Sequence, residues 1–402
     1  MICAAVERCA GIDVGKKWLS VCIMIGPLDG EPRVERQRFG VNVADLQQLR
    51  DWLSKEGVTH AVMESTGSYW KPVFNVLEDS VKVYLANPHE VKNCKGQKTD
   101  DKDRWWLAHL LRHAMIHPSF IPPRPLRELR DLTRRRERLN GAGSAEKNRV
   151  QKVLEDANVK LGNVLTDVFG VSGQLMLDAL LKGEAKPEEI AQFARKRAKK
   201  KIPEIIAALE GHQMSEHHRK MIRYSLSHMK FIEEQIEEID RDIAAKIQEA
   251  GLDRQWQTLQ TVPGVQQCSA AKILAETGAD MTQFPSQRNL SSWAGICPGN
   301  NRSAGKNRSN RPTGGNRWLR GALTECAWAA AAKKNCFLKE KFWRITTKSR
   351  GKNSALLAVA HTILQLVYEV LRTGQPSATA RPRPRVYSHS AGAGSQKVLS
   401  AN

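Results

Sequence analysis

The sequence predicts an α/β domain at the amino-terminal end, then a charged helical region, and then a mainly α-helical domain. Strand-like and helix-like patterns alternate over residues 8–122, helical patterns dominate residues 126–250, and a compact unit with its own helical patterns occupies residues 256–345. Residues 374–402 are rich in Pro, Ser, Ala, Gly and Arg and form a basic flexible tail. With 402 residues, 41% of them hydrophobic, the chain can form two or three packed domains.

The first domain is expected to contain three strands, a helix, a strand, a helix, a strand and a helix. Two β-rich runs within residues 10–25 are separated by Gly15-Lys16-Lys17, which predicts a hairpin, and Arg33–Val41 supplies the third strand. The other predicted elements are a helix at 44–56, a strand at 60–63, a helix at 72–77, a strand at 81–85, and a helix through Trp105 and Trp106 that ends before Pro118.

Acidic residues occur at strand ends and helix starts of this domain. Asp13 lies inside the first apolar strand, and Glu64 follows the fourth. Asp100 and Asp103, at i and i+3, share one face at the start of the last helix. A buried carboxylate requires a compensating cation, and in an RNase H-like sheet these positions meet at one edge, where two Mg²⁺ ions can hold a phosphate. Asp101 competes with Asp100, and capping or surface roles are the alternative for each acid taken singly.

The central region contains one apolar seam and two basic runs. Spacings of three and four residues connect Met229, Ile232, Ile236, Ile239 and Ile243. The seam fits either an antiparallel helical hairpin or the contact of a dimer. Residues 134–136 (RRR) and 195–201 (RKRAKKK) add positive charge, so we expect this region to bind RNA or DNA.

Two features of the third domain suggest contact with phosphates. The turn at Gly264, between two helical patterns, resembles a helix-hairpin-helix that offers backbone N–H groups to a phosphate, although a plain Pro-Gly turn fits equally well. The polar segment 298–315 and the residues after it supply candidate nucleic-acid contacts: Arg302, Lys306, Arg308, Arg311, Arg317 and Arg320. Ser303 and Ser309 lie among them, and composition alone favours loop serines that bond a phosphate, because a serine nucleophile needs activation.

The global composition indicates a polyanionic partner. The 63 Lys and Arg against 42 Asp and Glu leave a formal net charge of +21, for which nucleic acid is the first candidate. The eight cysteines are scattered without metal-binding spacing, so we expect them to be reduced and buried. No stretch approaches the ~18–20 apolar residues of a membrane span, which predicts a soluble intracellular protein without a membrane partner.

Taken together, these motifs resemble the DEDD transposases of the IS110 type, including the IS-eleven-eleven subgroup. The resemblance rests on residues 11–14 (GIDV), 63–67 (MESTG), 87–88 (NP), 98–103 (KTDDKD), 261–265 (TVPGV), 293–298 (WAGICP), 303–306 (SAGK) and 315–320 (GNRWLR). It implies a RuvC-type RNase H domain joined by a coiled coil to a smaller transposase domain.

The resemblance also implies roles for individual residues. Asp13, Glu64, Asp100 and Asp103 would be ligands of a two-metal Mg²⁺ site, and Ser303 would attack DNA. The active site would combine the acids of one subunit with the serine of another in a dimer or tetramer. A structured guide RNA would direct it to the ends of a bacterial insertion sequence and to its target DNA. The protein would then be cytoplasmic and associated with the nucleoid.

Two other functions remain open from the sequence. A Holliday-junction or structure-selective endonuclease would use the acids alone, without Ser303. A non-catalytic nucleic-acid-binding protein would need the acids only for its structure.

Overall fold

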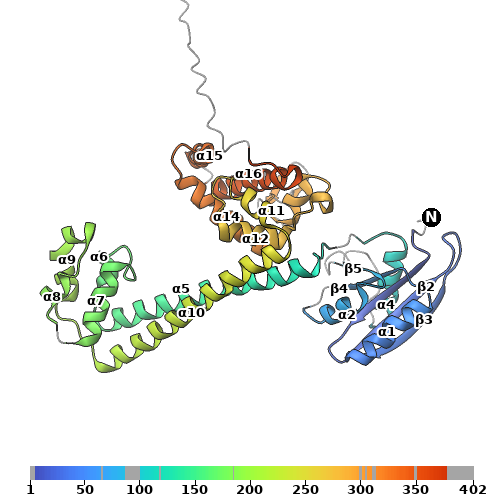
Figure 1. The fold of residues 1–402 in the computed structure, drawn as a ribbon, viewed down its shortest axis with the longest axis horizontal. Coiled ribbons are helices and arrows are strands. Elements are labelled where there is room, and N and C mark those ends of the chain that lie inside the picture. The colour runs from blue at the N-terminus through green and yellow to red at the C-terminus, as the bar shows by residue number, and fades with distance from the viewer. Residues whose placement is uncertain are drawn as a thin grey trace, which may run out of the picture. The chain divides into compact units, whose positions relative to one another are not determined.

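The computed structural model describes residues 5–64, 67–86, 100–116, 119–183, 185–297, 301–303, 306–309, 314–347 and 351–377. The chain forms two compact units, Met1–Ile121 and Pro122–Asn402, each considered below by itself. Figure 1 shows the strands within the first unit and the helices of the second.

The first unit has the predicted order of strands and helices. Its elements are β1 (Arg8–Val14), β2 (Trp18–Ile25), β3 (Arg33–Gly40), α1 (Val43–Lys55), β4 (His60–Glu64), α2 (Trp70–Leu77), β5 (Lys82–Ala86) and α4 (Asp100–Arg112). Gly15 to Lys17 form the turn between β1 and β2, as predicted. Glu64 is the last residue of β4 rather than the first after it.

One mixed sheet organises this unit, in the order β3-β2-β1-β4-β5. The first three strands are antiparallel, and β4 and β5 run parallel to β1. This arrangement agrees with the RNase H-like sheet expected from the sequence. The helices α1 and α2 cover one face, where Leu46, Leu49 and Leu53 are buried with Ala10 and Ile12. Burial of each leucine contributes about 1.5–3 kcal/mol.

Helix α4 covers the other face of the sheet. Its Leu107, Ala108 and Leu111 pack in one apolar cluster with Cys9 and Val62. Because side chains alternate along a strand, the odd-numbered residues of β1 and the even-numbered residues of β2 and β4 belong to this face. The last residue of β1 on the α4 side is therefore Asp13, and the last of β4 is Glu64.

The second unit is almost wholly helical. Its central helices are α5 (Arg124–Asp156), α6 (Leu161–Val164), α7 (Val171–Lys182), α8 (Pro187–Ala191), the 3₁₀ helix η1 (Lys196–Lys201), α9 (Ile202–Leu209) and α10 (Glu216–Glu249). The later elements are α11 (Asp253–Leu259), α12 (Gln267–Thr277), η2 (Met281–Gln283), α13 (Gln287–Trp293), β6 (Asn301–Ser303), β7 (Lys306–Ser309), α14 (Arg317–Ala332), α15 (Phe337–Ile345) and α16 (Gly351–Thr373).

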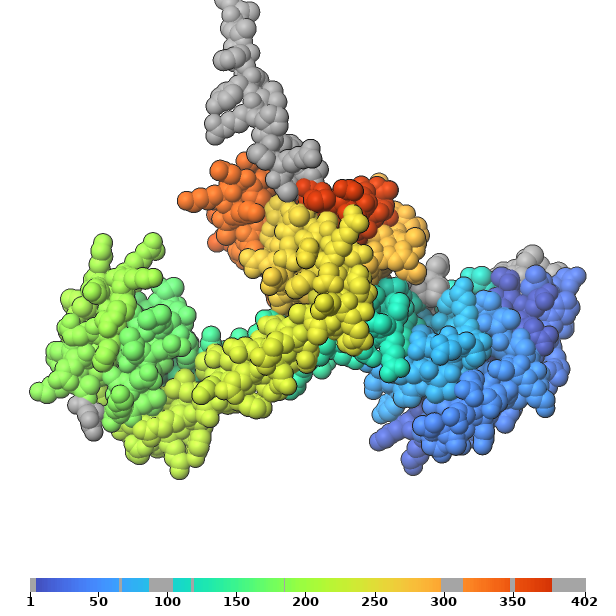
Figure 2. All heavy atoms as spheres, viewed as in Figure 1, coloured from blue at the N-terminus to red at the C-terminus, as the bar shows by residue number. Residues whose placement is uncertain are grey.

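The long helices α5 and α10 form an antiparallel pair within one chain, and their atoms pack as a continuous rod in Figure 2. Ion pairs join Glu128 to Lys246 (2.9 Å) at one end and Asp156 to His218 (3.0 Å) at the other. The seam residues Met229, Ile232 and Ile243 are buried. Of the two arrangements that the seam allowed, the structure therefore contains the intramolecular hairpin. Helices α6 to α9 connect the end of α5 to the start of α10. They form a small head with its own apolar cluster.

Helix α16 of the second unit corrects the expectation that no stretch approaches a membrane span. Its 23 residues are long and apolar enough to cross a membrane by length and composition, a stretch that the sequence reading did not single out. In the structure α16 packs against α14 and α15, with ten of its residues buried. It lies beyond the predicted domain end at residue 345 but belongs to the core that contains α14.

Candidate active site and nucleic-acid contacts

Asp13 and Glu64 occupy adjacent positions on neighbouring parallel strands. The pairing of β1 with β4 proceeds through Ile12 and Met63, so Asp13 and Glu64 are next in register. Neighbouring strands lie about 4.8 Å apart, and both residues belong to the face that α4 covers. Both are half-buried. The fold thus brings together two of the four acids at the carboxyl ends of β1 and β4.

The packing of α4 onto β1 determines where the other two acids lie. A Cβ atom at Gly11 would stand 2.2 Å from the Arg104 carbonyl oxygen and 2.5 Å from the Ala108 nitrogen. Further back along β1, the Cys9 Sγ atom lies 3.6 Å from the carbonyl oxygen of Ala108. Helix α4 therefore runs opposite to β1, and its first turn, at Asp100–Asp103, lies toward the Asp13 end of the strand. The side chains of Asp100 and Asp103 are outside the described residues.

The donor set at this strand edge suits a hard divalent cation. Two carboxylates on adjacent strands repel each other unless a cation or proton lies between them, and carboxylate oxygens are the preferred ligands of Mg²⁺. Within the side chains that the structure describes, no group of three His, Cys, Asp or Glu could hold a metal ion. A site of four carboxylates requires Asp100 and Asp103, so it remains a prediction.

An exposed aromatic and basic edge borders the acids and was not identified from the sequence. Asp13 pairs with Ser20 on β2, and Trp18, two residues from Ser20 on the same face, is 53% exposed. The guanidinium of Arg38, which pairs with Ser20 from β3, lies 5.8 Å from the centroid of the Trp18 ring. Diagonal neighbours in a sheet are about 7–8 Å apart, within reach of an aromatic side chain. The local sequence around Trp18 gives no sign that it lies near Asp13; the pairing of β2 with β1 shows it.

The segment that carries Ser303 contains a two-stranded hairpin, although the sequence predicted a loop. In it, β6 pairs with β7 so that Ser303 stands opposite Lys306, and Arg302 and Arg308 lie in the same two strands. Ser303 is thus the last strand residue before the turn. Arg311 lies outside the described residues, as do the side chains of the other four.

Both ends of this segment are held together at one point. A Cβ at Gly315 would stand 2.4 Å from the Gly295 nitrogen, so the two backbones touch where only glycine fits. The Asn316 backbone N–H donates to the Trp293 carbonyl (3.0 Å). Asn316 also accepts bonds from the N–H groups of Trp318 and Leu319 and so caps α14. The residues before and after the hairpin segment are therefore joined by a direct backbone contact and a hydrogen bond.

A buried carboxylate, Glu276 of α12, connects Asn316 to α5. Glu276 is 1% exposed and accepts two bonds from Arg134 (2.8 and 2.9 Å) and one from the Asn316 amide (2.7 Å). Arg130 donates to the Glu276 carbonyl (2.8 Å), and burial lowers the pKa of its guanidinium. The basic run on α5 looked like a nucleic-acid contact in the sequence, but Arg134 neutralises an internal acid instead. Glu276 itself gave no signal in the sequence.

The remaining predicted contacts have different surroundings. Arg317 is exposed at the start of α14. Arg320 donates to the Gly295 carbonyl (3.4 Å). Gly264 has φ +90°, and a Cβ there would lie 2.2 Å from the Cys326 carbonyl oxygen of α14. This close packing accounts for the glycine, while its phosphate contact stays a prediction.

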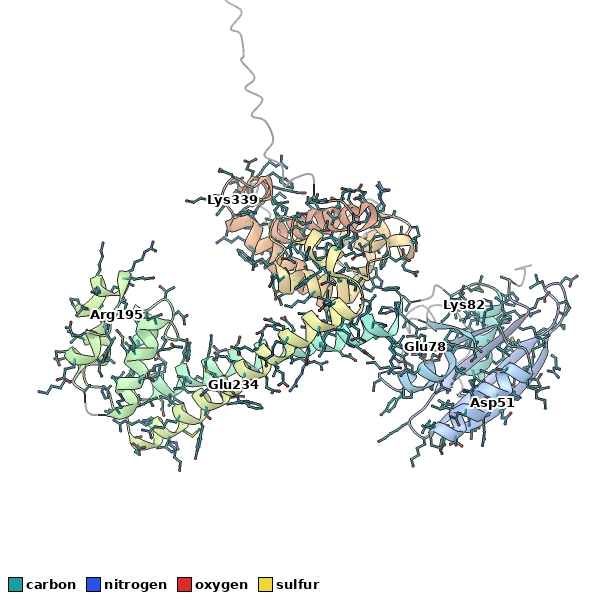
Figure 3. The ribbon with its side chains drawn as sticks, viewed as in Figure 1. Asp51, Glu78, Lys82, Arg195, Glu234 and Lys339 are labelled. Atoms are coloured by element: carbon teal, nitrogen blue, oxygen red, sulfur yellow. The ribbon has the colours of Figure 1, made fainter. Side chains whose placement is uncertain are left out.

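The second basic run of the sequence lies on the head. Arg195, labelled in Figure 3, precedes η1, whose residues Lys196–Lys201 include five more cations. All six basic side chains are exposed. Such a concentration of exposed positive charge attracts a phosphate backbone without reading its sequence.

Comparison with known proteins adds independent findings. The model of a DEDD transposase family matches residues 10–159, and a second model, described as the transposase IS116/IS110/IS902 family, matches residues 256–342. Together they cover more than half of the chain. The chain is also 32% identical over 120 residues to an uncharacterized 43.6 kDa protein of insertion element IS110 from Streptomyces coelicolor. That match spans 29% of this chain and 28% of the relative.

Proposed function

Because this chain belongs to the IS110 family of DEDD transposases, we propose that it cleaves, exchanges and rejoins the DNA strands of a bacterial insertion sequence. The observation that carries the proposal is the pair of carboxylates, Asp13 and Glu64, at adjacent strand ends of an RNase H-like sheet, with the start of α4 beside them.

In this proposal the acids hold the phosphate that reacts. Asp13 and Glu64 act with Asp100 and Asp103, and the four carboxylates bind two Mg²⁺ ions. The bound cations would neutralise the charge that builds up on the phosphate oxygens during strand transfer. Trp18 and Arg38, at the exposed edge beside the acids, would bind the DNA strand next to the phosphate.

Ser303 is the proposed nucleophile. Its hydroxyl oxygen would bond to phosphorus while the bond from phosphorus to a sugar oxygen breaks, and the hydroxyl proton would pass to solvent or to the departing oxygen. One phosphoester replaces another, so the protein-linked strand can be rejoined to a new end without an external energy source. Lys306 is the register partner of Ser303 in the hairpin, and its positive charge would favour the alkoxide of Ser303.

Partners and assembly are part of the same proposal. The net charge of +21 suits two polyanions, DNA and a structured guide RNA, and the exposed run from Arg195 to Lys201 is a candidate contact for either. The acids of one subunit would act with the serine of another in a dimer or tetramer, in the cytoplasm near the nucleoid. A strict monomer in sedimentation, with and without RNA, would contradict the shared site.

The decisive experiment compares three variants on DNA that carries the element ends, together with RNA transcribed from the flanking non-coding segment. Ser303→Ala should abolish both cleavage and a covalent protein–DNA adduct in denaturing gels, and Asp13→Asn should do the same. Ser309→Ala, from the facing strand of the same hairpin, is the matched comparison: it removes a hydroxyl that would only bond a phosphate, so cleavage should fall in part at most and the adduct should still form.

Each alternative function has its own result in this experiment. Cleavage by Ser303→Ala but not by Asp13→Asn would replace the recombinase with an endonuclease that uses the acids alone. Binding without cleavage of any substrate, indifferent to Mg²⁺ and to Asp13→Asn, would identify a non-catalytic nucleic-acid-binding protein.

A further inference from the structure

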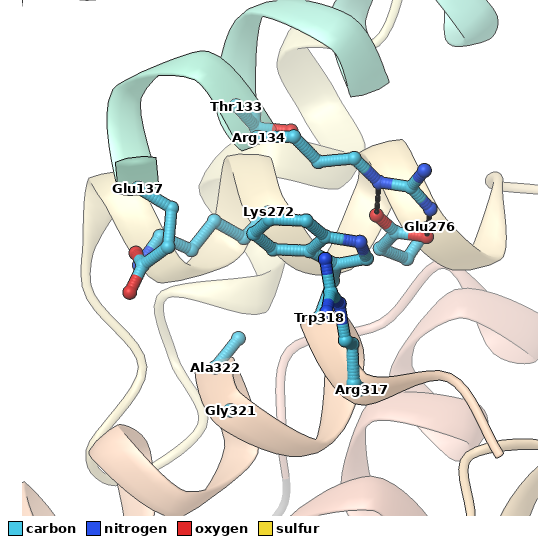
Figure 4. Close-up of a pocket in the computed structure, with 9 residues that line it drawn as sticks. All are labelled: Thr133, Arg134, Glu137, Lys272, Glu276, Arg317, Trp318, Gly321 and Ala322. Atoms are coloured by element: carbon cyan, nitrogen blue, oxygen red, sulfur yellow. Dashed lines mark hydrogen bonds and ion pairs between the residues drawn. The ribbon is translucent and has the colours of Figure 1, made fainter. Parts of the chain in front are cut away.

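A cavity of about 250 Å³ lies where α5, α12 and α14 meet, close to the base of the Ser303 hairpin (Figure 4). The indole ring of Trp318 is one wall, and Gly321 and Ala322 of α14 line another part. A Cβ at Gly321 would have no atom within 4 Å, so the space above this helix face is open. The cavity is smaller than the ~300–1,000 Å³ typical of drug-sized ligands, which suits one planar group rather than a duplex.

Two arginines close to the Trp318 ring of this cavity form no ion pair with any carboxylate that the structure describes. Arg134 is paired with Glu276, and Lys272 with Glu137 and Glu325. Arg138 of α5 and Arg317 of α14 are exposed, and within the described parts of the chain neither forms an ion pair.

Both guanidiniums nevertheless converge on one ring. The Arg317 and Arg138 guanidinium carbons lie 4.7 and 5.6 Å from the Trp318 ring centroid. Arg134, although paired, lies 5.4 Å from it. Three guanidiniums around one indole repel one another, so the two unpaired ones are placed to receive an anion.

We propose that this cavity binds one unpaired nucleotide of a single strand, with its base stacked on Trp318 and its phosphate held by Arg138 and Arg317. The proposal rests on the function proposed above, because it assigns a nucleotide contact to the domain that carries Ser303. An aromatic face stacks any base, and planar guanidiniums bind phosphate oxygens in pairs. The pocket would hold a base out of the duplex beside the hairpin that delivers the serine.

The test measures binding of labelled 20-nucleotide single strands, in DNA and RNA versions, to the full-length protein by fluorescence anisotropy without Mg²⁺. Trp318→Ala should weaken binding about tenfold or more, and Trp318→Phe, which keeps an aromatic face, should recover most of it. The double variant Arg138→Met/Arg317→Met should weaken binding and reduce the slope of log K against log salt by about 0.7, as expected for the loss of one phosphate contact on a single strand.

Two further variants keep the test decisive if Trp318→Ala does not fold. Gly321→Leu fills the cavity and improves helix propensity, so it should weaken binding without a loss of thermal stability. Arg254→Met removes one exposed arginine of α11 outside the cavity lining and should leave affinity unchanged. Wild-type affinity in Gly321→Leu and in the double variant would overturn the proposal.

The comparison of DNA with RNA identifies the source of the nucleotide. Weakening of both probes supports a shared nucleotide pocket, and weakening of one alone supports the proposal and assigns that strand. Binding is measured without cleavage, so the two proposals can fail separately. If binding depends on Trp318 but Ser303→Ala still cleaves DNA, only the proposed recombinase function is refuted. If cleavage depends on Ser303 but the pocket variants bind single strands with wild-type affinity, only the proposed nucleotide pocket is refuted.

Discussion

Gly11→Ala tests how the candidate site is built. The added methyl group would lie 2.2 Å from the Arg104 carbonyl oxygen, whereas ordinary contacts begin near 3.4 Å. Helix α4 must therefore move away by about 1 Å, because the obstacle is backbone rather than a flexible side chain. A gap of 0.5–1 Å already removes a quarter to a half of each contact energy across the interface. Overpacking typically costs 1–3 kcal/mol, so we expect a loss of about 3 kcal/mol in the free energy of unfolding of the first unit.

Differential scanning calorimetry of the full chain measures this loss, since the two units contain separate cores. Only one transition should shift to lower temperature, and DNA cleavage should fall further than the remaining folded fraction explains, because the start of α4 moves away from Asp13. Gly141→Ala is the matched control: its Cβ would meet nothing within 4 Å on α5, so it should stabilise by up to ~1 kcal/mol. Wild-type stability and activity in Gly11→Ala would refute the close packing of α4 on β1.

Three further perturbations follow from the described contacts. Glu276→Gln removes the acid that neutralises Arg134 and should destabilise the second unit by about 3 kcal/mol, measured by urea unfolding; a loss under ~0.5 kcal/mol would contradict the buried network. Burial raises the pKa of the Cys9 thiol from 9.0 to about 12, so above pH 9 only the unfolded state loses this proton. The free energy of unfolding should therefore fall with rising pH, by about 1.4 kcal/mol at pH 10, and this part should vanish in Cys9→Ala; equal pH dependence in both proteins would count against it. Trp18→Ala should weaken binding of single-stranded DNA about tenfold while Trp18→Phe retains it, and no change in fluorescence anisotropy would exclude Trp18 from the DNA contact.

The sequence predicted the order of elements well because that order depends on local periodicity. Alternating and helical patterns identified every strand of the sheet, and Asp13 stood out because an acid is unexpected among apolar strand residues. The hairpin of β6 and β7 was missed, since its residues are polar throughout and carry no such alternation.

The candidate site was recognised by residue type but its construction was not. Nothing in the local sequence tells that Gly11 is needed to bring α4 close, since Arg104 and Ala108 lie more than 90 positions away. Likewise Arg134 looked like a nucleic-acid contact until Glu276, 142 residues further along, proved to be its partner.

By itself, then, the sequence determined the family, and it predicted the class of partner and the identity of the acids and the serine. These depend on residue types and short spacings that need no third dimension. The tertiary structure decided which seam closes within one chain, which cations are neutralised inside and which remain for a ligand, as Arg138 and Arg317 do. These outcomes depend on contacts between segments that are distant in the sequence. Whether a charged side chain is neutralised, and what an apolar seam packs against, is decided only by the residues that the fold brings next to it.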